Sequence, residues 1–290
     1  MKAKHFLPII TCIALIIILA TFVTTTRREQ SEEQKRQDAI ADALHSTELE
    51  KLKEIRAQQE KERLERIEMN NTYTVYQRFQ ERSLNIHVLY LGDEVMYGAG
   101  VDPRTQSFRI LLRNMYKKYF NPNIIGTELT PKKGENIFNY SRNAITAFTS
   151  LYDLHLTYIS IGSDESYTNF AYEYERIVRT AKLPRQRDNG EDKGKLSDVL
   201  CIIQHDQSDE DAEAIIAIAE YYGVICVDLR GIFDGRENTM LDENGLPNIK
   251  GNEIYADEIF PYLKKAITEL KETPPCPDEM LFSPISVEVE

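Results

Sequence analysis

The stretch from Ile86 to Gly100, IHVLYLGDEVMYGAG, constrains the fold more than any other part of this chain. It starts with a continuous apolar run, Val88–Leu91, of the length and composition expected for a strand buried on both faces of a parallel sheet. A glycine ends this run, and from position 107 onward apolar residues recur at helical spacing. In open α/β sheets the turns that leave the carboxyl ends of strands hold the ligand site, so Asp93 and Glu94 are candidate site residues.

The rest of the globular part alternates between predicted strands and predicted helices. The further strands are expected at Asn136–Ser141, Leu156–Ile161, Val199–Gln204 and Val224–Leu229. The further helices are expected at about Thr168–Ala181, Asp209–Tyr222 and Gly251–Leu270. This alternation requires right-handed crossovers and a parallel sheet covered on both faces. The sequence therefore predicts a three-layer α/β/α sandwich with a five-stranded parallel sheet in flavodoxin-like order.

An uncharged segment lies near the N-terminus. Phe6–Val23 carries no charge over 18 residues, which is the minimum length for a helix that spans a bilayer. A cleaved signal peptide is the alternative, but its apolar core is usually shorter, and residues 20–25 offer only a poor cleavage site. We expect an uncleaved anchor over residues 1–26. Lys and Arg flank both ends, so their count does not decide the topology, and the short basic N-terminus favours an extracytoplasmic globular domain.

A charged segment follows the anchor. Residues 26–71 contain no Gly or Pro and are dense in Glu, Lys, Arg, Gln and Ala, which predicts a helix. Apolar residues do not recur as a sustained heptad seam, so we expect a solvated stalk over 27–83 that dimerises weakly, with a true coiled coil as the alternative. The globular domain is placed at 84–272, and a Pro-rich acidic tail at 273–290.

The charge balance limits the partners of this chain. A formal net charge of −12 argues against nucleic acid, because neutralising phosphates requires an excess of Lys and Arg. None of the four cysteines belongs to a C-x-x-C or a His/Cys cluster, so no zinc site is predicted, and no cofactor is expected. The partners that remain are a membrane, a glycan, another protein or a second copy of the chain.

The segment LGDEVMYGAGV resembles the first conserved block of the SGNH/GDSL hydrolases, in which Gly-Asp-Ser is followed shortly by a Gly and the Ser is the nucleophile. Gly92, Asp93 and Gly98 match this block, but Glu94 stands at the nucleophile position. The resemblance covers about residues 85–270 and implies the esterase fold of this family. It also raises the question of whether this chain still performs ester chemistry.

The later blocks keep residues that define the fold and replace residues that react. In NYSRNAIT, Ala144 stands where the family has an oxyanion-hole Gly, and in IGSDE, Asp164 stands at the position of the oxyanion-hole Asn. In the last block Glu243 and Leu246 take the places of the catalytic Asp and His. The same block keeps four residues of the family pattern: Pro247, Asn248, Gly251 and Ala256.

Ester hydrolysis by this route needs a hydroxyl nucleophile, an imidazole base and donors aimed at the oxyanion. The replacements predict a protein that binds or scaffolds, with envelope glycans as the ligand class implied by the resemblance. The candidate ligand-site residues are Asp93, Glu94, Asn143, Asp164 and His205.

Two alternatives stay open at the level of the sequence. An active esterase could use relocated residues, with Ser141 or Ser163 as the nucleophile and His205, oriented by Asp206, as the base. Alternatively, carboxylates at the same edge of the sheet could bind a hard cation such as Ca²⁺ or Mg²⁺. These carboxylates are Glu94, Asp164, Glu165 and Asp206.

Overall fold

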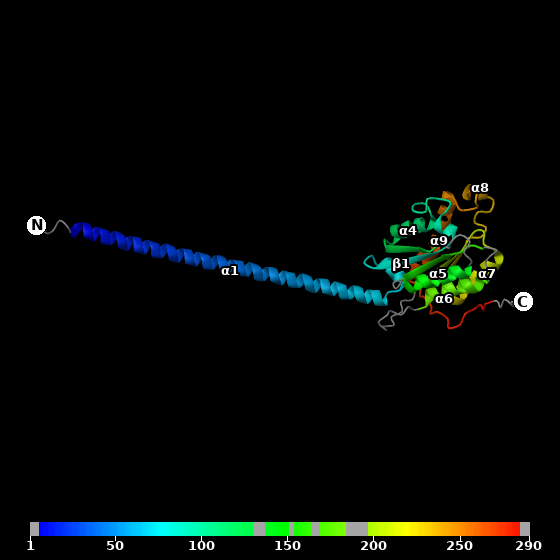
Figure 1. The fold of residues 1–290 in the computed structure, drawn as a ribbon, viewed down its shortest axis with the longest axis horizontal. Coiled ribbons are helices and arrows are strands. Elements are labelled where there is room, and N and C mark those ends of the chain that lie inside the picture. Colours follow the sequence, from blue (N-terminus) through cyan, green and yellow to red (C-terminus); the bar gives the residue numbers. More distant parts are fainter. Residues whose placement is uncertain (1–5, 130–136, 151–153, 164–168, 184–196, 285–290) are drawn as a thin grey trace. The chain divides into compact units, whose positions relative to one another are not determined.

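The computed structural model describes residues 6–129, 137–150, 154–163, 169–183 and 197–284 and, within the first helix, only part of the side chains. The chain divides into two compact units, Met1–Glu65 and Arg66–Glu290. Most of helix α1 (Phe6–Thr72) forms the first unit, and the second unit contains the sheet (Figure 1).

The second unit alternates between strands and helices as the sequence predicts. Its strands are β1 (Asn85–Gly92), β2 (Asn123–Leu129), β3 (Leu154–Ser160), β4 (Asp198–Ile203) and β5 (Ile225–Asp228). Its helices after α1 are α2 (Val75–Gln80), α3 (Glu94–Tyr97), α4 (Phe108–Tyr119), α5 (Ile137–Ser150), α6 (Phe170–Lys182), α7 (Asp209–Tyr222), α8 (Glu237–Met240) and α9 (Ile249–Thr268).

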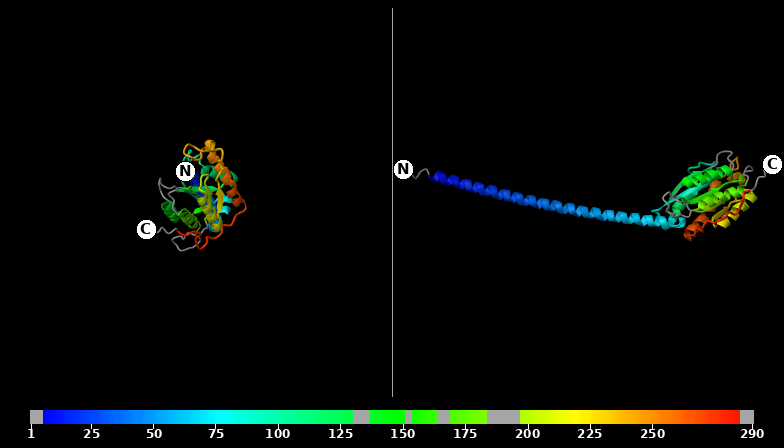
Figure 2. Two further views of the ribbon diagram at one scale, coloured as in Figure 1. Left: turned by 90° about the vertical axis from the view of Figure 1, so that its right-hand side faces the viewer. Right: turned by 60° about the horizontal axis from the view of Figure 1, so that its bottom comes forward.

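The five strands form one parallel sheet in the order β2-β1-β3-β4-β5, so the predicted flavodoxin-like order is confirmed. Every residue of the central strands β3 and β4 is buried, as expected for strands covered on both faces. One apolar cluster joins the sheet to α2, α4 and α9, and a second joins it to α5, α6 and α7. Figure 2 shows the helices of the second cluster lying side by side over one face of the sheet.

The prediction of the second strand is wrong. Residues 137–141, expected in a strand, begin helix α5, and the strand is β2, in a segment expected to be a loop. Ile137, Tyr140, Ala144 and Phe148 recur at intervals of three and four residues and are all buried, which is the pattern of a helix. Strand β2 lies at the sheet edge and buries only Ile124, so its sequence carries neither an apolar run nor an alternation.

Helix α2 and the C-terminal tail both pack against the globular unit. In α2 the side chains of Val75, Tyr76 and Phe79 are buried in the first apolar cluster. Residues 271–284 form no helix or strand, in agreement with the prediction for the Pro-rich tail. The tail crosses the face formed by α6 and α7, where it appears red in Figure 2.

Two side chains of α6 hold the backbone of the tail. The Arg179 guanidinium donates to the carbonyl oxygens of Pro277, Asp278 and Glu279 at 2.6–3.1 Å. The fully buried Glu175 carboxylate accepts from the backbone N–H groups of Leu281 and Phe282 at 2.5 and 2.7 Å. It also accepts from the Tyr222 hydroxyl of α7 at 2.8 Å. This carboxylate therefore links the tail to both helices.

A buried charge lies at the amino end of β4. Asp198 accepts a hydrogen bond from the Tyr76 hydroxyl, and its carboxylate lies 3.9 Å from the ammonium groups of Lys182 and Lys271. Asp198 and Lys182 are both fully buried. Burial lowers the pKa of Lys182, and the charge of Asp198 opposes this effect. Because Tyr76 belongs to α2, this cluster joins the start of the globular unit to the sheet.

The predicted anchor lies within α1, and most of its side chains between residues 6 and 18 lie outside the described residues. Among the side chains that are described, no helix combines the length and the apolar character needed to cross a bilayer.

Candidate functional site

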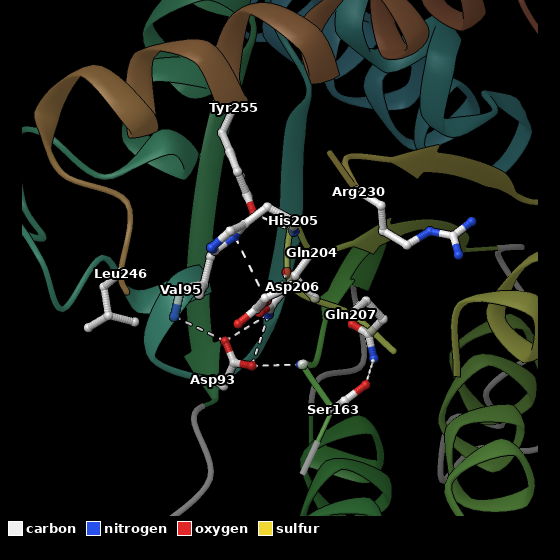
Figure 3. Close-up of polar contacts among 12 residues, drawn as sticks. Asp93, Val95, Ser163, Gln204, His205, Asp206, Gln207, Arg230, Leu246 and Tyr255 are labelled. Atoms are coloured by element: carbon white, nitrogen blue, oxygen red, sulfur yellow. Dashed lines mark hydrogen bonds and ion pairs between the residues drawn. The ribbon is translucent and has the colours of Figure 1, made fainter. Parts of the chain in front are cut away.

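Asp93 is the polar centre of the carboxyl edge of the sheet, where it follows β1 directly. Its Oδ1 accepts from the backbone N–H of Val95 at 3.0 Å and caps the short helix α3. Its Oδ2 accepts from the backbone N–H of Gly162, just after β3, at 2.6 Å. The side-chain amide of Gln204, just after β4, donates to both oxygens at 2.9 Å (Figure 3). Asp93 therefore joins the ends of three neighbouring strands.

The same carboxyl group has a perturbed acidity. Burial raises the pKa of Asp93 above its usual value, and the charge of the nearby Asp206 adds to this effect. The hydrogen bonds from Gly162, Gln204 and Val95 act in the opposite direction, because they favour the ionised form. All these groups donate to the carboxylate, so the primary role of Asp93 is to fix the geometry of the edge.

Glu94 occupies the first position of α3, where the resemblance places the nucleophile. Its side chain is exposed, and it has no hydroxyl group that could attack an ester. A carboxylate at this place also repels the negative charge that develops on a tetrahedral intermediate.

Leu246 lies in the loop that leads to α9, where the resemblance places the catalytic imidazole. Its side chain is half-buried against the first apolar cluster, and the loop lies against Gly100, whose added Cβ would meet the Leu246 Cβ at 3.3 Å. The loops of the first and last blocks are therefore neighbours. Glu243 is exposed in the same loop, and it is Asp242 that accepts from the backbone N–H of Leu246, at 2.9 Å.

The residues that the family pattern conserves in the last block hold this loop in place. The Asn248 side chain caps α9 by accepting from the N–H groups of Lys250 and Gly251. It donates to the carbonyl oxygens of Thr239 and Leu241 at 3.0 and 3.3 Å. Asn248 thus has a role in the fold that requires no catalysis.

The predicted oxyanion position at Ala144 is wrong in its structural setting. With a strand expected at Asn136–Ser141, Ala144 was predicted to follow the end of that strand, but it is fully buried in the middle of α5, where backbone N–H groups are engaged within the helix. Asn143 is exposed on the same helix. Asp164 and Glu165 lie outside the described residues, as does the segment 130–136 that follows β2.

His205 follows Gln204 at the end of β4 and contacts aromatic residues. The Tyr255 hydroxyl accepts from the His205 backbone N–H at 3.0 Å and lies 2.8 Å from its Nδ1. Burial keeps the pKa of Tyr255 far above its usual value, so the hydroxyl retains its proton and can donate it to Nδ1. The imidazole ring packs edge-on against Phe233. Asp206 is exposed, and its carboxylate lies 3.8 Å from Nδ1.

Neither candidate serine pairs with His205. The Ser141 hydroxyl is buried in α5 and bonds to Glu173 and to the Phe138 carbonyl oxygen. The Ser163 hydroxyl donates to Asp211 at 2.5 Å and accepts from the Ser208 N–H at 2.9 Å, which ties it to the start of α7. It also lies 2.9 Å from the side-chain amide of Gln207 (Figure 3). Among the described residues, the Ser–His pair of the relocated-triad alternative is not formed.

The described residues also show no cluster of carboxylates that would support the alternative of a bound cation. Within the described ranges, no group of three or more His, Cys, Asp or Glu side chains is placed to hold a metal ion. Near the same edge, the Arg230 guanidinium donates to Asp228 and Asp209, and its bonds lower the pKa of Asp228.

The sequence did not lead us to predict two residues of the site, Gln204 and Tyr255. Gln204 is a polar residue at the carboxyl end of a buried strand, the same signal that singled out Asp93, so its position alone could have found it. Tyr255 lies inside α9, where a buried aromatic residue is typical of an ordinary core, and no sequence signal marks it.

Comparison with known proteins identifies the fold. No family profile matches this sequence, and no curated protein sequence matches it. A two-domain esterase active on acetylated mannans, co-crystallised with mannopentaose, superposes with a TM-score of 0.52 at 18% identity, over 70% of this chain and 53% of that chain. Another structure of such an esterase has a TM-score of 0.51 at 17% identity, over 77% of this chain and 57% of that chain.

A psychrotrophic esterase from Pseudoalteromonas sp., inhibited by monoethylphosphonate, has a TM-score of 0.45 at 14% identity. Its alignment spans 63% of this chain and 98% of the esterase chain. The globular unit has the fold of the two mannan esterases, as the sequence resemblance to the SGNH/GDSL hydrolases predicts. The chain spans little more than half the length of the two mannan esterase structures.

Proposed function

We propose that this chain is a membrane-anchored protein whose SGNH-fold domain binds a ligand at the carboxyl edge of the sheet and does not hydrolyse it. The observation that carries this proposal is the pair of residues at the reacting positions, with an exposed carboxylate at Glu94 and an aliphatic side chain at Leu246. Leucine cannot accept a proton, and a carboxylate at the start of α3 is neither a hydroxyl nucleophile nor a donor to an oxyanion.

The surroundings of the other candidate residues support the same proposal. Ser141 and Ser163 are engaged in α5 and at the start of α7, and the Nδ1 atom of His205 is engaged with Tyr255. Asp93 and Gln204 keep the edge rigid without contributing a nucleophile. A binding site needs such a rigid framework, whereas an esterase also needs the reacting groups.

The ligand class we favour is a glycan or its acylated form. Two solved structures with this fold are esterases active on acetylated mannans. Exposed polar groups at the carboxyl edge, Glu94 and Asp206 among them, suit hydrogen bonding to sugar hydroxyls. The uncharged segment Phe6–Val23 and the helical stalk would then hold this domain at the outer face of a membrane.

The direct experiment measures hydrolysis and binding with the same preparation. The full chain, purified in detergent, is assayed with 4-nitrophenyl acetate and with acetylated mannan, and its affinity for acetylated and deacetylated mannan is measured by calorimetry. We expect no turnover above the buffer rate, and binding that weakens in Glu94→Ala and Asp206→Ala. Exposed Glu213→Ala on α7 is the matched control.

An active enzyme with relocated residues gives a different result. Turnover that disappears in Ser141→Ala, Ser163→Ala or His205→Ala would replace our proposal with the esterase alternative. Absence of both turnover and mannan binding would leave the fold assignment intact and exclude acetylated mannan as the ligand.

A further inference from the structure

Two cysteines face each other across the last two strands of the sheet. Cys201 of β4 and Cys226 of β5 are partners in the parallel register, and both are free thiols. Register partners in neighbouring parallel strands point their side chains to the same face. Both cysteines do contact the apolar cluster between the sheet and α5, α6 and α7.

Their backbone spacing suits a covalent bond. Neighbouring strands lie about 4.7–4.9 Å apart, and the Cα atoms of disulfide-bonded cysteines usually lie about 4.4–6.8 Å apart. Because β5 is an edge strand of four residues, it is paired on one side only and can adjust to the bond.

One of the two thiols is accessible from outside. Cys201 is fully buried, whereas Cys226 is half-buried and lines a groove of about 520 Å³ along β5, between α7 and α9. Glu220, Asp228 and Lys271 also line this groove. Because the Arg230 guanidinium also pairs with Asp228, the charges around the groove balance, and they offer no excess positive charge to attract an anionic reagent such as oxidised glutathione. A small neutral reagent needs no such charge.

We propose that Cys201 and Cys226 form a reversible disulfide between β4 and β5, made by exchange with a small neutral dialkyl disulfide that enters the groove. The Cys226 thiolate attacks one sulfur of the reagent, which forms a mixed disulfide and releases one alkyl thiolate. The Cys201 thiolate then attacks the Cys226 sulfur and releases the second. The two protons of the cysteines end on the two released thiols, and the reagent takes up the two electrons.

The environment of the thiols sets the rate of this exchange. Burial raises the pKa of Cys226 to about 12, and it raises that of Cys201 as well. Only a small fraction of either sulfur is a thiolate at neutral pH, so the exchange is slow and accelerates with pH. The product ties the edge strand to its neighbour covalently, and it should stabilise the sheet against local opening of β5.

The test uses the full chain in detergent, first reduced and then incubated with bis(2-hydroxyethyl) disulfide at pH 8.5. After alkylation and digestion without reductant, mass spectrometry identifies the linked peptides. We expect a Cys201–Cys226 linkage in the majority of chains, two equivalents of 2-mercaptoethanol released for each linkage formed, and a rise in Tm. Dithiothreitol should reverse the linkage and the rise in Tm.

Two variants separate this site from the other cysteines. Cys276→Ser should keep the linkage and the rise in Tm, and Cys226→Ser should lose both while retaining the circular dichroism of the wild type. A stable hydroxyethylthio adduct on Cys226 with Cys201 still free would overturn the proposal. A linkage from either cysteine to Cys12 or Cys276 would overturn it as well. If Cys226→Ser fails to fold, the peptide map of the wild type still decides between these outcomes.

Discussion

The side-chain amide of Gln204 donates to both oxygens of Asp93, at 2.9 Å each, and so connects the end of β4 to the end of β1. The same amide lies 3.1 Å from the Ser160 hydroxyl at the end of β3. These contacts cross the central strands at the edge where ligands bind in this class of fold. The arrangement makes Asp93 a structural residue, and its substitution should affect stability first.

Asp93→Asn should destabilise the domain by about 1–3 kcal/mol, because the new NH₂ group faces donors from Val95, Gly162 and Gln204. Urea unfolding followed by circular dichroism measures this loss. Asp102→Asn is the matched control, since Asp102 is exposed and bonds only within its own turn. A loss in the control as large as in Asp93→Asn would contradict this role.

The acidity of Asp93 gives the same variant a pH dependence. Its pKa is raised in the folded protein, so in the window between the usual value and the raised one the folded state binds more protons than the unfolded state. Protonated Asp93 therefore stabilises the folded state at acidic pH, and this stabilisation is lost as the pH rises through the pKa that Asp93 has in the folded protein. The stability difference between wild type and Asp93→Asn should be larger at pH 4 than at pH 7. An equal difference at both values would contradict the raised pKa.

Glu175→Ala should destabilise the domain by about 3 kcal/mol, because it leaves Tyr222 and the tail N–H groups of Leu281 and Phe282 without their acceptor. The tail should also become sensitive to proteases, which gel electrophoresis after limited digestion measures. Glu213→Ala, on the exposed side of α7, should leave both properties unchanged. A tail that stays protected in Glu175→Ala would show that this carboxylate does not hold it.

Asp198→Asn should cost about 3–5 kcal/mol at pH 7, because it leaves the buried Lys182 ammonium without its nearest countercharge. The pKa of Lys182 is lowered in the folded protein, so as the pH rises the Lys182 ammonium loses its proton in the folded state before it does so in the unfolded state. The cost of burying Lys182 therefore falls as the pH rises, and the folded state gains stability. The destabilisation by Asp198→Asn should therefore shrink between pH 7 and pH 9.5 in urea titrations. Exposed Asp257→Asn on α9 is the control, and a constant destabilisation would show that Lys182 stays charged.

Glu94→Ser combined with Leu246→His should give weak hydrolysis of 4-nitrophenyl acetate, because the pair restores a nucleophile and a base at the family positions. Each single substitution should remain at the buffer rate. Absence of an oxyanion donor typically costs about 10²–10³ in rate, so the double variant should stay well below a native esterase. Equal activity in Leu246→His alone would indicate catalysis by a free imidazole.

The sequence predicts the central part of the fold better than its edge. Strands β3 and β4 are buried on both faces, so their composition alone marks them as strands. Strand β2 is held mainly by its backbone pairing with β1, which begins with Asn123 opposite Asn85. Backbone pairing does not require a particular pattern of side chains, so the sequence of β2 does not show it. Helix α5 contains the apolar residues that the sequence analysis assigned to the second strand.

The candidate site was predictable where it follows from strand ends and family blocks. Asp93 and Glu94 follow β1 at the start of α3, and Leu246 lies in the loop that leads to α9. The Tyr255 hydroxyl bonded to His205 comes from the middle of α9, and a contact between positions 50 residues apart depends on tertiary packing. The misplacement of Ala144 follows directly from the wrong second strand.

The tail contacts have a consequence for the order in which the domain folds. Leu281 and Phe282 donate two of the N–H groups that the buried Glu175 accepts, yet they lie more than 100 residues further along the chain, at separations of 106 and 107. A folding chain that has already formed α6 and α7 must keep this carboxylate hydrated until the tail docks. Docking of the tail therefore completes the face formed by α6 and α7, and proteolytic cleavage between α9 and Leu281 would be expected to loosen both helices.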